Sequence, residues 1–170
     1  TGTTSARAHL SIDPSSLDAY MREQVDGYES PVEIEKLQGG QSNPTYLLTT
    51  PKRKYVLRRK PPGKLLPSAH AVEREYKVMT ALNKWGFPAP RTYTLCEDAD
   101  VIGTAFFIMD YVEGRIFWDA GLPDVEKSER APLFHALTDT LADLHTIDYR
   151  KVGLADFGKP GNYFARQIDR

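Results

Sequence analysis

The sequence has one cysteine, Cys96, so no disulfide can form within the chain and no multi-cysteine zinc site can be built. Its longest strictly apolar run is Ala105–Met109, far short of the roughly 20 residues that a membrane-spanning helix needs. No signal peptide opens the chain. With 22 Lys and Arg against 23 Asp and Glu, the basic excess of a dedicated nucleic-acid binder is missing. We therefore expect a cytoplasmic protein with neither a membrane nor a nucleic acid as its partner.

The composition is that of a folded protein. Hydrophobic residues make up 41% and charged residues 26% of the 170 residues, unlike the charge-rich, aromatic-poor composition of disordered chains. A chain of this length fits one domain, or one domain with an additional subdomain. It starts without Met and stops where a helix from Tyr163 is beginning. We therefore expect it to be the front part of a longer protein.

The order of predicted elements is that of an α+β domain. Residues 1–12 are small and polar, and we expect them to form a tail. Asp13 and Pro14 start a helix over 14–26, and a second helix is capped by Ser68 and stops at Gly86. Strands are predicted at 32–37, 45–50, 55–59, 91–96 and 104–112, with an acidic turn between the last two. A long helix over 128–147 carries an apolar stripe made of Leu133, Phe134, Leu137, Leu141 and Leu144.

A glycine-rich turn, residues 39–43, joins the first two strands. Glycines such as Gly39 and Gly40 let backbone N–H groups approach phosphates, because no side chain is in the way. An ordinary hairpin turn is the alternative interpretation. The turn is not a Walker P-loop, and neither is Gly63-Lys64, because Leu65 stands where that motif needs Ser or Thr.

Arg58 is the candidate cation of the third strand. By the period of two it shares a face with Val56, where a half-buried cation needs an anion. Its neighbours are expected at a solvated strand edge; they are Lys52, Arg53, Lys54, Arg59 and Lys60. Glu75 borders the buried face of the following helix and is the natural partner, whereas Glu73 points further away. A structural ion pair or a solvated carboxylate remains the alternative for Glu75.

Six segments together resemble a known family. They are Gly-Gly-Gln-Ser-Asn-Pro-Thr-Tyr at 39–46, Tyr-Val-Leu-Arg-Arg-Lys-Pro-Pro-Gly at 55–63, Val-Glu-Arg-Glu-Tyr at 72–76, Gly-Phe-Pro-Ala-Pro at 86–90, Ile-Met-Asp-Tyr-Val-Glu-Gly-Arg at 108–115 and Leu-Ala-Asp-Leu-His at 141–145. In this order they resemble the N-terminal half of the aminoglycoside phosphotransferase and choline kinase superfamily. The resemblance is greatest to the phosphotransferase domains that occur alone in bacteria or fused to acyl-CoA dehydrogenases.

The resemblance implies a protein kinase-like N-lobe over residues 13–112, in which a five-stranded antiparallel sheet packs on one main helix. The hinge exit and the first part of a helical C-lobe would follow over 113–170. It also implies an ATP site. In that site Arg58 would bind the α- and β-phosphates, Glu75 would orient Arg58, and Val56 would cover the adenine. The remaining residues would be the loop of Gly39, Gly40, Ser42 and Asn43, with Ser42 near the β-phosphate, and the hinge of Met109, Asp110, Tyr111 and Val112, with backbone groups of Asp110 and Val112 on the adenine edge.

The sequence departs from the family in one respect. The catalytic His-Gly-Asp loop with its Asn, and the later Asp that binds Mg²⁺, do not occur in it and would lie beyond Arg170. We therefore assign no catalytic residue and no metal ligand within the chain, and expect the chain alone to be inactive, because phosphoryl transfer depends on positioning and charge stabilisation.

The function implied for the whole protein is transfer of the γ-phosphoryl group of ATP, with Mg²⁺, to the hydroxyl group of a small molecule. Aminoglycoside-like, choline-like or hydroxylated acyl compounds are the candidate acceptors. Two alternatives stay open: a non-catalytic nucleotide-binding or regulatory module, and a nucleic-acid binder that uses the basic residues between 52 and 64.

Overall fold

The structure is a computed structural model that describes residues 12–37, 42–63, 70–158 and 161–168. The chain divides into two compact units. The first contains the residues up to Asn83 together with Pro88–Gly114, and the second contains Lys84–Phe87 and the residues from Arg115 onward. None of the helices in the described ranges is long and apolar enough to cross a bilayer.

The first unit is built on a five-stranded antiparallel sheet with the strand order β1-β2-β3-β5-β4. The strands are β1 (Glu33–Lys36), β2 (Thr45–Thr49), β3 (Lys54–Arg59), β4 (Thr92–Cys96) and β5 (Phe106–Asp110). Short connections join β1 to β2 and β2 to β3, as antiparallel neighbours allow. The α+β fold with five antiparallel strands, predicted from the sequence, is confirmed.

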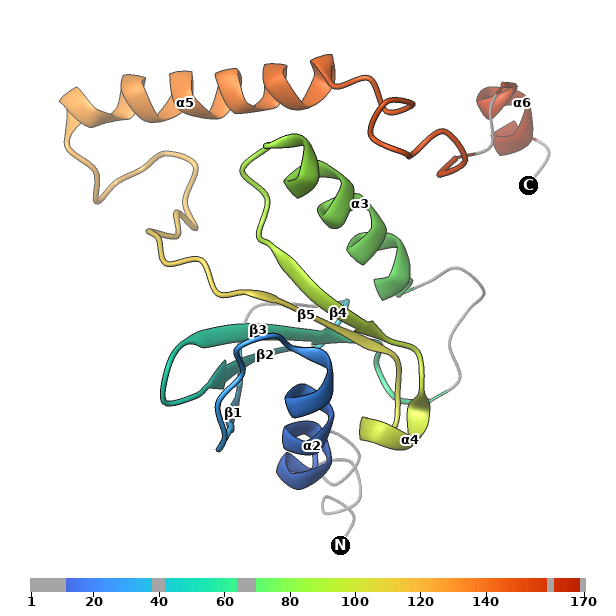
Figure 1. Ribbon diagram of the computed structural model, residues 1–170. Helices are drawn as coiled ribbons and strands as arrows, with labels where there is room; N and C mark the ends of the chain where they lie inside the picture. The colour runs from blue at the N-terminus through green and yellow to red at the C-terminus, as the bar shows by residue number, and fades with distance from the viewer. Residues whose placement is uncertain (1–11, 38–41, 64–69, 159–160, 169–170) are drawn as a thin grey trace, which may run out of the picture. The chain divides into compact units, whose positions relative to one another are not determined.

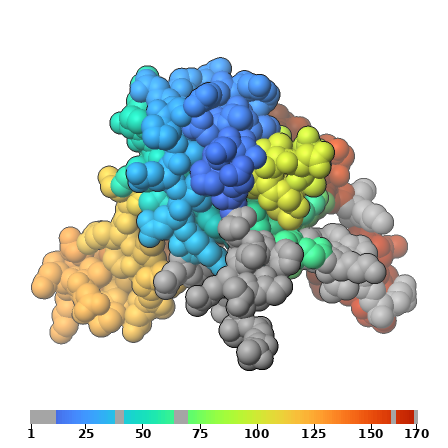
Figure 2. Space-filling model, turned by 90° about the horizontal axis from the view of Figure 1, so that it is seen from below, coloured from blue at the N-terminus to red at the C-terminus, as the bar shows by residue number. Residues whose placement is uncertain are grey.

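Helices α2 (Pro14–Gln24) and α4 (Ala99–Ile102) cover one face of this sheet (Figure 1). Seen from that side, they lie next to each other (Figure 2). The Asp13 side chain caps α2 by accepting hydrogen bonds from the backbone N–H groups of Ser15 and Ser16. The main hydrophobic core lies between these helices and the sheet; among its members are Leu17, Met21, Tyr46, Leu48, Tyr55, Leu57, Phe106 and Ile108.

Helix α4 stands where the sequence predicted an acidic turn. Asp98 caps its first turn by accepting a hydrogen bond from the N–H of Asp100 at 2.9 Å. Gly103 ends it in the left-handed conformation, with φ at 87°, which glycine adopts without steric cost. The connection between β4 and β5 is therefore a capped helical turn, and it places Ile102 in the core.

Helix α3 (Val72–Trp85) packs on the opposite face of the sheet (Figure 1). The ring of Tyr76 lies 6.0 Å from that of Phe107 in β5, in an edge-to-face arrangement, and Val72 is fully buried. The capping residue predicted for this helix, Ser68, lies outside the described residues.

Strand β3 distributes its side chains between the two faces. Tyr55 and Leu57 belong to the core under α2, whereas Arg58 contacts α3. The prediction that Arg59 is solvated is wrong: it is 1% exposed, its guanidinium lies 5.8 Å from the ring of Tyr46, and its Nη1 donates to the carbonyl of Ile102. The alternation of a strand directs Arg59 to the same side as Tyr55 and Leu57.

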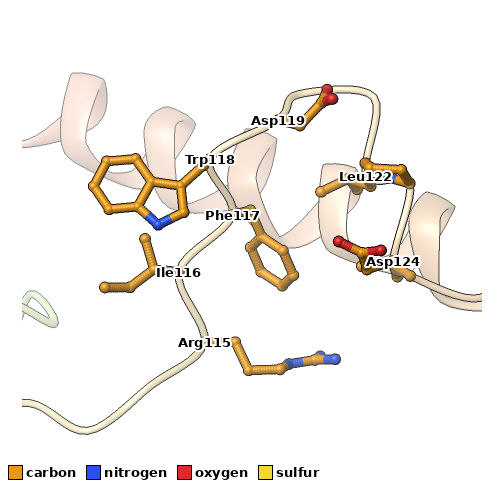
Figure 3. Close-up of a pocket in the computed structure, with 9 residues that line it drawn as sticks. Arg115, Ile116, Phe117, Trp118, Asp119, Leu122 and Asp124 are labelled. Atoms are coloured by element: carbon orange, nitrogen blue, oxygen red, sulfur yellow. The ribbon is translucent and has the colours of Figure 1, made fainter.

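The second unit contains α5 (Lys127–Thr146) and α6 (Tyr163–Ile168). The apolar stripe predicted for the long helix is present, but most of it is exposed in the described structure: Phe134 is 50% exposed, Leu137 64% and Leu141 48%. Before α5, residues 115–125 form an irregular loop around a pocket of about 290 Å³. Figure 3 shows Arg115 and Phe117 on one side of its backbone, and Ile116 and Trp118 on the other.

Candidate functional site

An ion pair between β3 and α3 is the centre of the candidate site. Arg58 Nε lies 2.5 Å from Glu75 Oε2, and the two side chains are 30% and 35% exposed. Two positions that the sequence predicted to be partners are therefore in contact, on the face of the sheet that α3 covers. Partial exposure leaves the guanidinium, which has five donors in a fixed fork, able to meet a further anion.

Asn43 connects this ion pair to the end of the glycine-rich turn. Its amide Nδ2 donates a hydrogen bond of 2.7 Å to Glu75 Oε1, and the residue is 2% exposed. Thr45 Oγ1 donates to the carbonyl of Asn43 at 3.2 Å and accepts from Arg58 Nη1 at 3.4 Å. Arg58, Glu75, Asn43 and Thr45 therefore form a closed ring of contacts that ties β2, β3 and α3 together.

His70 extends this ring at the start of α3. Its Nδ1 lies 3.0 Å from Asn43 Oδ1. His70 was not among the predicted site residues, because no motif or periodicity in the sequence marks it. Its contact with Asn43 joins residues 27 positions apart, which only the folded chain brings together.

A second ion pair joins α3 to Lys60, the residue that follows β3. Lys60 Nζ lies 2.9 Å from Glu73 Oε2, and the side chains are 27% and 37% exposed. Although burial on its own would raise the pKa of Glu73, the hydrogen bond and charge of Lys60 lower it below the usual value. Glu73 therefore points to β3 and not away from it, contrary to the expectation from the helix wheel, and Lys60 is not a free surface cation.

An apolar surface continues from Arg58 on the same face of the sheet. Val56 lies two residues before Arg58, and its register partner in β5 is Met109. Arg58 itself is opposite Phe107. Three of the predicted site residues therefore share one face, with a cation at one end and two apolar side chains towards the end of β5.

At the C-terminal end of β5, polar contacts lie on the face of the sheet opposite Arg58. Tyr93 OH donates to Asp110 Oδ1 at 2.5 Å and accepts from Arg53 Nη1 at 3.1 Å. Burial and this hydrogen bond to Asp110 raise the pKa of Tyr93. The backbone N–H of Asp110 donates to the carbonyl of Arg91 at 2.8 Å, so this donor is engaged within the sheet.

The other predicted hinge residues, Tyr111 and Val112, follow the end of β5, and Tyr111 is half-buried. Lys54 Nζ is 5.5 Å from the ring centroid of Tyr111, and Val112 is 66% exposed. In the predicted phosphate loop, Ser42 is exposed, whereas Gly39 and Gly40 lie outside the described residues. Among the described residues, no three His, Cys, Asp or Glu side chains cluster as metal ligands would.

The pocket at residues 115–125 was not predicted from the sequence. Its cation, Arg115, lies 3.5 Å from Glu129 and stacks on Phe117. Its carboxylate Asp119 accepts a hydrogen bond of 2.7 Å from the N–H of Gly121. Arg115 and Asp119 therefore each have a partner within the second unit. Asp124 is the third charged residue of the pocket lining (Figure 3).

Comparison with known proteins assigns the chain to a family. Residues 33–170 match the model of the "Phosphotransferase enzyme family". The chain belongs to this phosphotransferase family. A solved structure from Ralstonia eutropha, described as a "putative aminoglycoside phosphotransferase", is 46% identical and superposes with a TM-score of 0.79 over 94% of this chain. The resemblance found in the sequence and the kinase-like fold are thereby confirmed.

Curated relatives of this phosphotransferase-family chain carry another name. Acyl-CoA dehydrogenase family member 11 of Rattus norvegicus is 42% identical over 161 residues, which are 92% of this chain and 21% of that protein. Acyl-CoA dehydrogenase family member 10 of Mus musculus is 40% identical over 167 residues, which are 98% of this chain and 16% of that protein. The chain thus spans 16–21% of these relatives and 46% of the solved structure.

Proposed function

We propose that this chain is the nucleotide-binding part of an ATP-dependent kinase that transfers the γ-phosphoryl group to a hydroxyl group of a small molecule. The observation that carries the proposal is the Arg58–Glu75 ion pair at 2.5 Å between β3 and α3. A strand cation held by a helix glutamate is the arrangement with which kinases position nucleotide phosphates. Membership of the phosphotransferase family and the fold support it.

The residues around the ion pair suit the two parts of a nucleotide. Arg58 offers a planar cation, which pairs well with phosphate oxygens. Val56 and Met109, opposite each other on the same face, offer an apolar surface for the adenine ring. Because the N–H of Asp110 already donates to Arg91, we infer that the adenine edge pairs with the carbonyl of Asp110 and the backbone of Val112.

ATP supplies the phosphoryl group in this proposal, and Mg²⁺ accompanies the nucleotide. We assign the metal ligands, the catalytic base and most of the acceptor pocket to the part of the longer relatives that this chain does not match. The relatives named acyl-CoA dehydrogenase favour a hydroxylated acyl compound as the acceptor over an aminoglycoside or choline. A non-catalytic nucleotide-binding role remains the second candidate for the isolated chain.

Titration of the 170-residue protein with Mg-ATP tests the nucleotide site. Arg58→Ala should weaken binding by about tenfold, since a hydrogen bond to a charged group contributes about 1.5–3 kcal/mol and solvent reduces this at a partly exposed site. Lys60→Ala is the matched control, because it breaks an ion pair of similar exposure between α3 and the residue that follows β3. Its affinity should stay close to that of the wild type.

Two results would contradict the proposal. Unchanged affinity in Arg58→Ala would remove this residue from the site, and an equal loss in Lys60→Ala would reduce the effect to general electrostatics. The thermal midpoints of both variants should change by similar small amounts, because partly exposed ion pairs contribute little to stability.

A further inference from the structure

His70 has an unusual backbone conformation. Its φ is 58°, in the left-handed region, and it is one of three non-glycine residues with positive φ among those described. A residue with a side chain pays a steric cost there that glycine does not pay. Strained backbone of this kind is concentrated at functional sites, where surrounding contacts hold it in place.

The side chain of His70 makes one hydrogen bond within the described structure, and the direction of that bond can be deduced. The carboxylate of Glu75 can only accept hydrogen bonds, so the Asn43 atom 2.7 Å from Glu75 Oε1 is its amide nitrogen. The carbonyl oxygen Oδ1 of Asn43 therefore faces His70. Because Oδ1 is an acceptor, Nδ1 of His70 carries the hydrogen and donates it.

A directed chain of contacts follows from this assignment. His70 donates to Asn43, Asn43 donates to Glu75, and Glu75 holds Arg58. Asn43 is buried, so its amide cannot exchange these partners for water without exposing the site. The neighbouring Lys60–Glu73 pair has no such extension among the interactions described.

We propose that His70 is a positioning residue of the nucleotide site. By fixing the amide of Asn43, it fixes the orientation of the Glu75 carboxylate and through it the guanidinium of Arg58. This inference rests on the proposed function, since it assigns a role in presenting Arg58 to phosphate. Asn43 then connects Glu75 in α3 with His70 before that helix, in addition to its predicted place in the phosphate loop.

Two substitutions separate the hydrogen bond from the backbone conformation. His70→Gly adopts positive φ freely but has no side-chain donor. His70→Asn tolerates the left-handed conformation and offers an amide donor near the position of Nδ1. If the contact with Asn43 positions Arg58, His70→Gly should weaken Mg-ATP binding by about threefold to tenfold, the size of one net hydrogen bond. His70→Asn should restore most of the affinity.

The thermal midpoint gives the second readout. His70→Gly relieves the strain at φ but leaves the buried Oδ1 of Asn43 without its donor. His70→Asn supplies a donor at the same φ, so its midpoint should be higher than that of His70→Gly. In an Asn43→Ala background, His70→Gly should cause no further loss of affinity, because the bridge is already absent. The NMR signal of the Arg58 Nε–H group should shift in His70→Gly without any nucleotide present.

Each other outcome overturns the inference. Wild-type affinity in His70→Gly, or failure of His70→Asn to restore binding, would leave His70 with a structural role only. Arg58→Ala separates this failure from that of the proposed function. If Arg58→Ala weakens binding and His70→Gly does not, only the role of His70 is lost; if the folded wild type does not bind Mg-ATP, both proposals fail.

Discussion

Replacement of Glu75 by Gln tests whether the contacts around Asn43 form one connected network. The two carboxylate oxygens of Glu75 serve different partners: Oε2 lies 2.5 Å from Arg58 Nε, and Oε1 accepts from Asn43 Nδ2 at 2.7 Å. A glutamine has one acceptor oxygen and one donor nitrogen. If its oxygen stays on Arg58, its nitrogen faces Asn43, whose amide must then turn over and present Oδ1.

The turned amide changes what His70 meets. Asn43 Nδ2 would then face His70 Nδ1, which is 3.0 Å from the amide in the wild type. Only an imidazole with a lone pair on Nδ1 can accept this hydrogen bond. We therefore expect Glu75→Gln to move the ring hydrogen of His70 from Nδ1 to Nε2. Long-range ¹H–¹⁵N correlations of the ring distinguish the two tautomers, with the wild-type protein as the reference.

The burial of Asn43 determines how much the two Glu75 variants differ in the free energy of unfolding. In Glu75→Gln every donor keeps an acceptor, so the loss is that of one partly exposed ion pair, about 0.2–1 kcal/mol. Glu75→Ala also leaves the buried amide of Asn43 without its acceptor, which costs about 1–3 kcal/mol more. Urea unfolding should therefore separate the two variants by about 1–3 kcal/mol in the free energy of unfolding.

Two observations on the Glu75→Gln variant would contradict a connected network. A His70 ring that keeps its hydrogen on Nδ1 would show that the amide of Asn43 does not relay the change. A free energy of unfolding as low as that of Glu75→Ala would show that the reorganised hydrogen bonds do not form. Either observation refutes the connected arrangement.

Two further predictions concern the stability of the folded chain. The hydrogen bond from Tyr28 holds the pKa of Asp18 below its usual value against the effect of burial, with smaller contributions from Ser30 and Arg22. Because the pKa is lower in the folded state, this stabilisation is present above the unfolded value of about 3.9 and is lost as the pH falls through the folded one. Asp18→Asn should flatten the acid limb of a circular-dichroism stability profile, and an unchanged limb would contradict this assignment. Phe106→Ala, at a fully buried position, should lower the free energy of unfolding by about 3–5 kcal/mol, whereas Trp118→Ala, 79% exposed, should change it by less than about 0.5 kcal/mol.

The sequence predicted the order and type of the main elements, because they depend on local signals. Asp13 with Pro14 marks the start of α2. The alternation over 32–37 marks β1, and the β-branched and apolar residues over 45–50 mark β2. Helix α4 was missed because four residues are too few for a helical period to appear, although Asp98 and Gly103 are recognisable capping residues. The stripe of α5 was detected, but periodicity does not say what covers it, and most of it is exposed in the described structure.

The candidate site was predictable only in its central pair. Arg58 and Glu75 could be matched because each stood on a half-buried face and needed an opposite charge. Glu73 was misplaced, since the position of a side chain at the margin of a helix face depends on where its partner, Lys60, comes to lie. His70 could not be predicted, because its importance comes from backbone strain and from a contact across 27 residues.

The alternation along β3 has a consequence for how this protein can evolve. Tyr55, Leu57 and Arg59 point to the core under α2, whereas Val56 and Arg58 point to the face that carries the candidate site. Selection for a stable fold and selection for a ligand therefore act on alternating residues of β3. Substitutions at every second position can change what this face recognises while the hydrophobic core that supports the sheet is inherited intact.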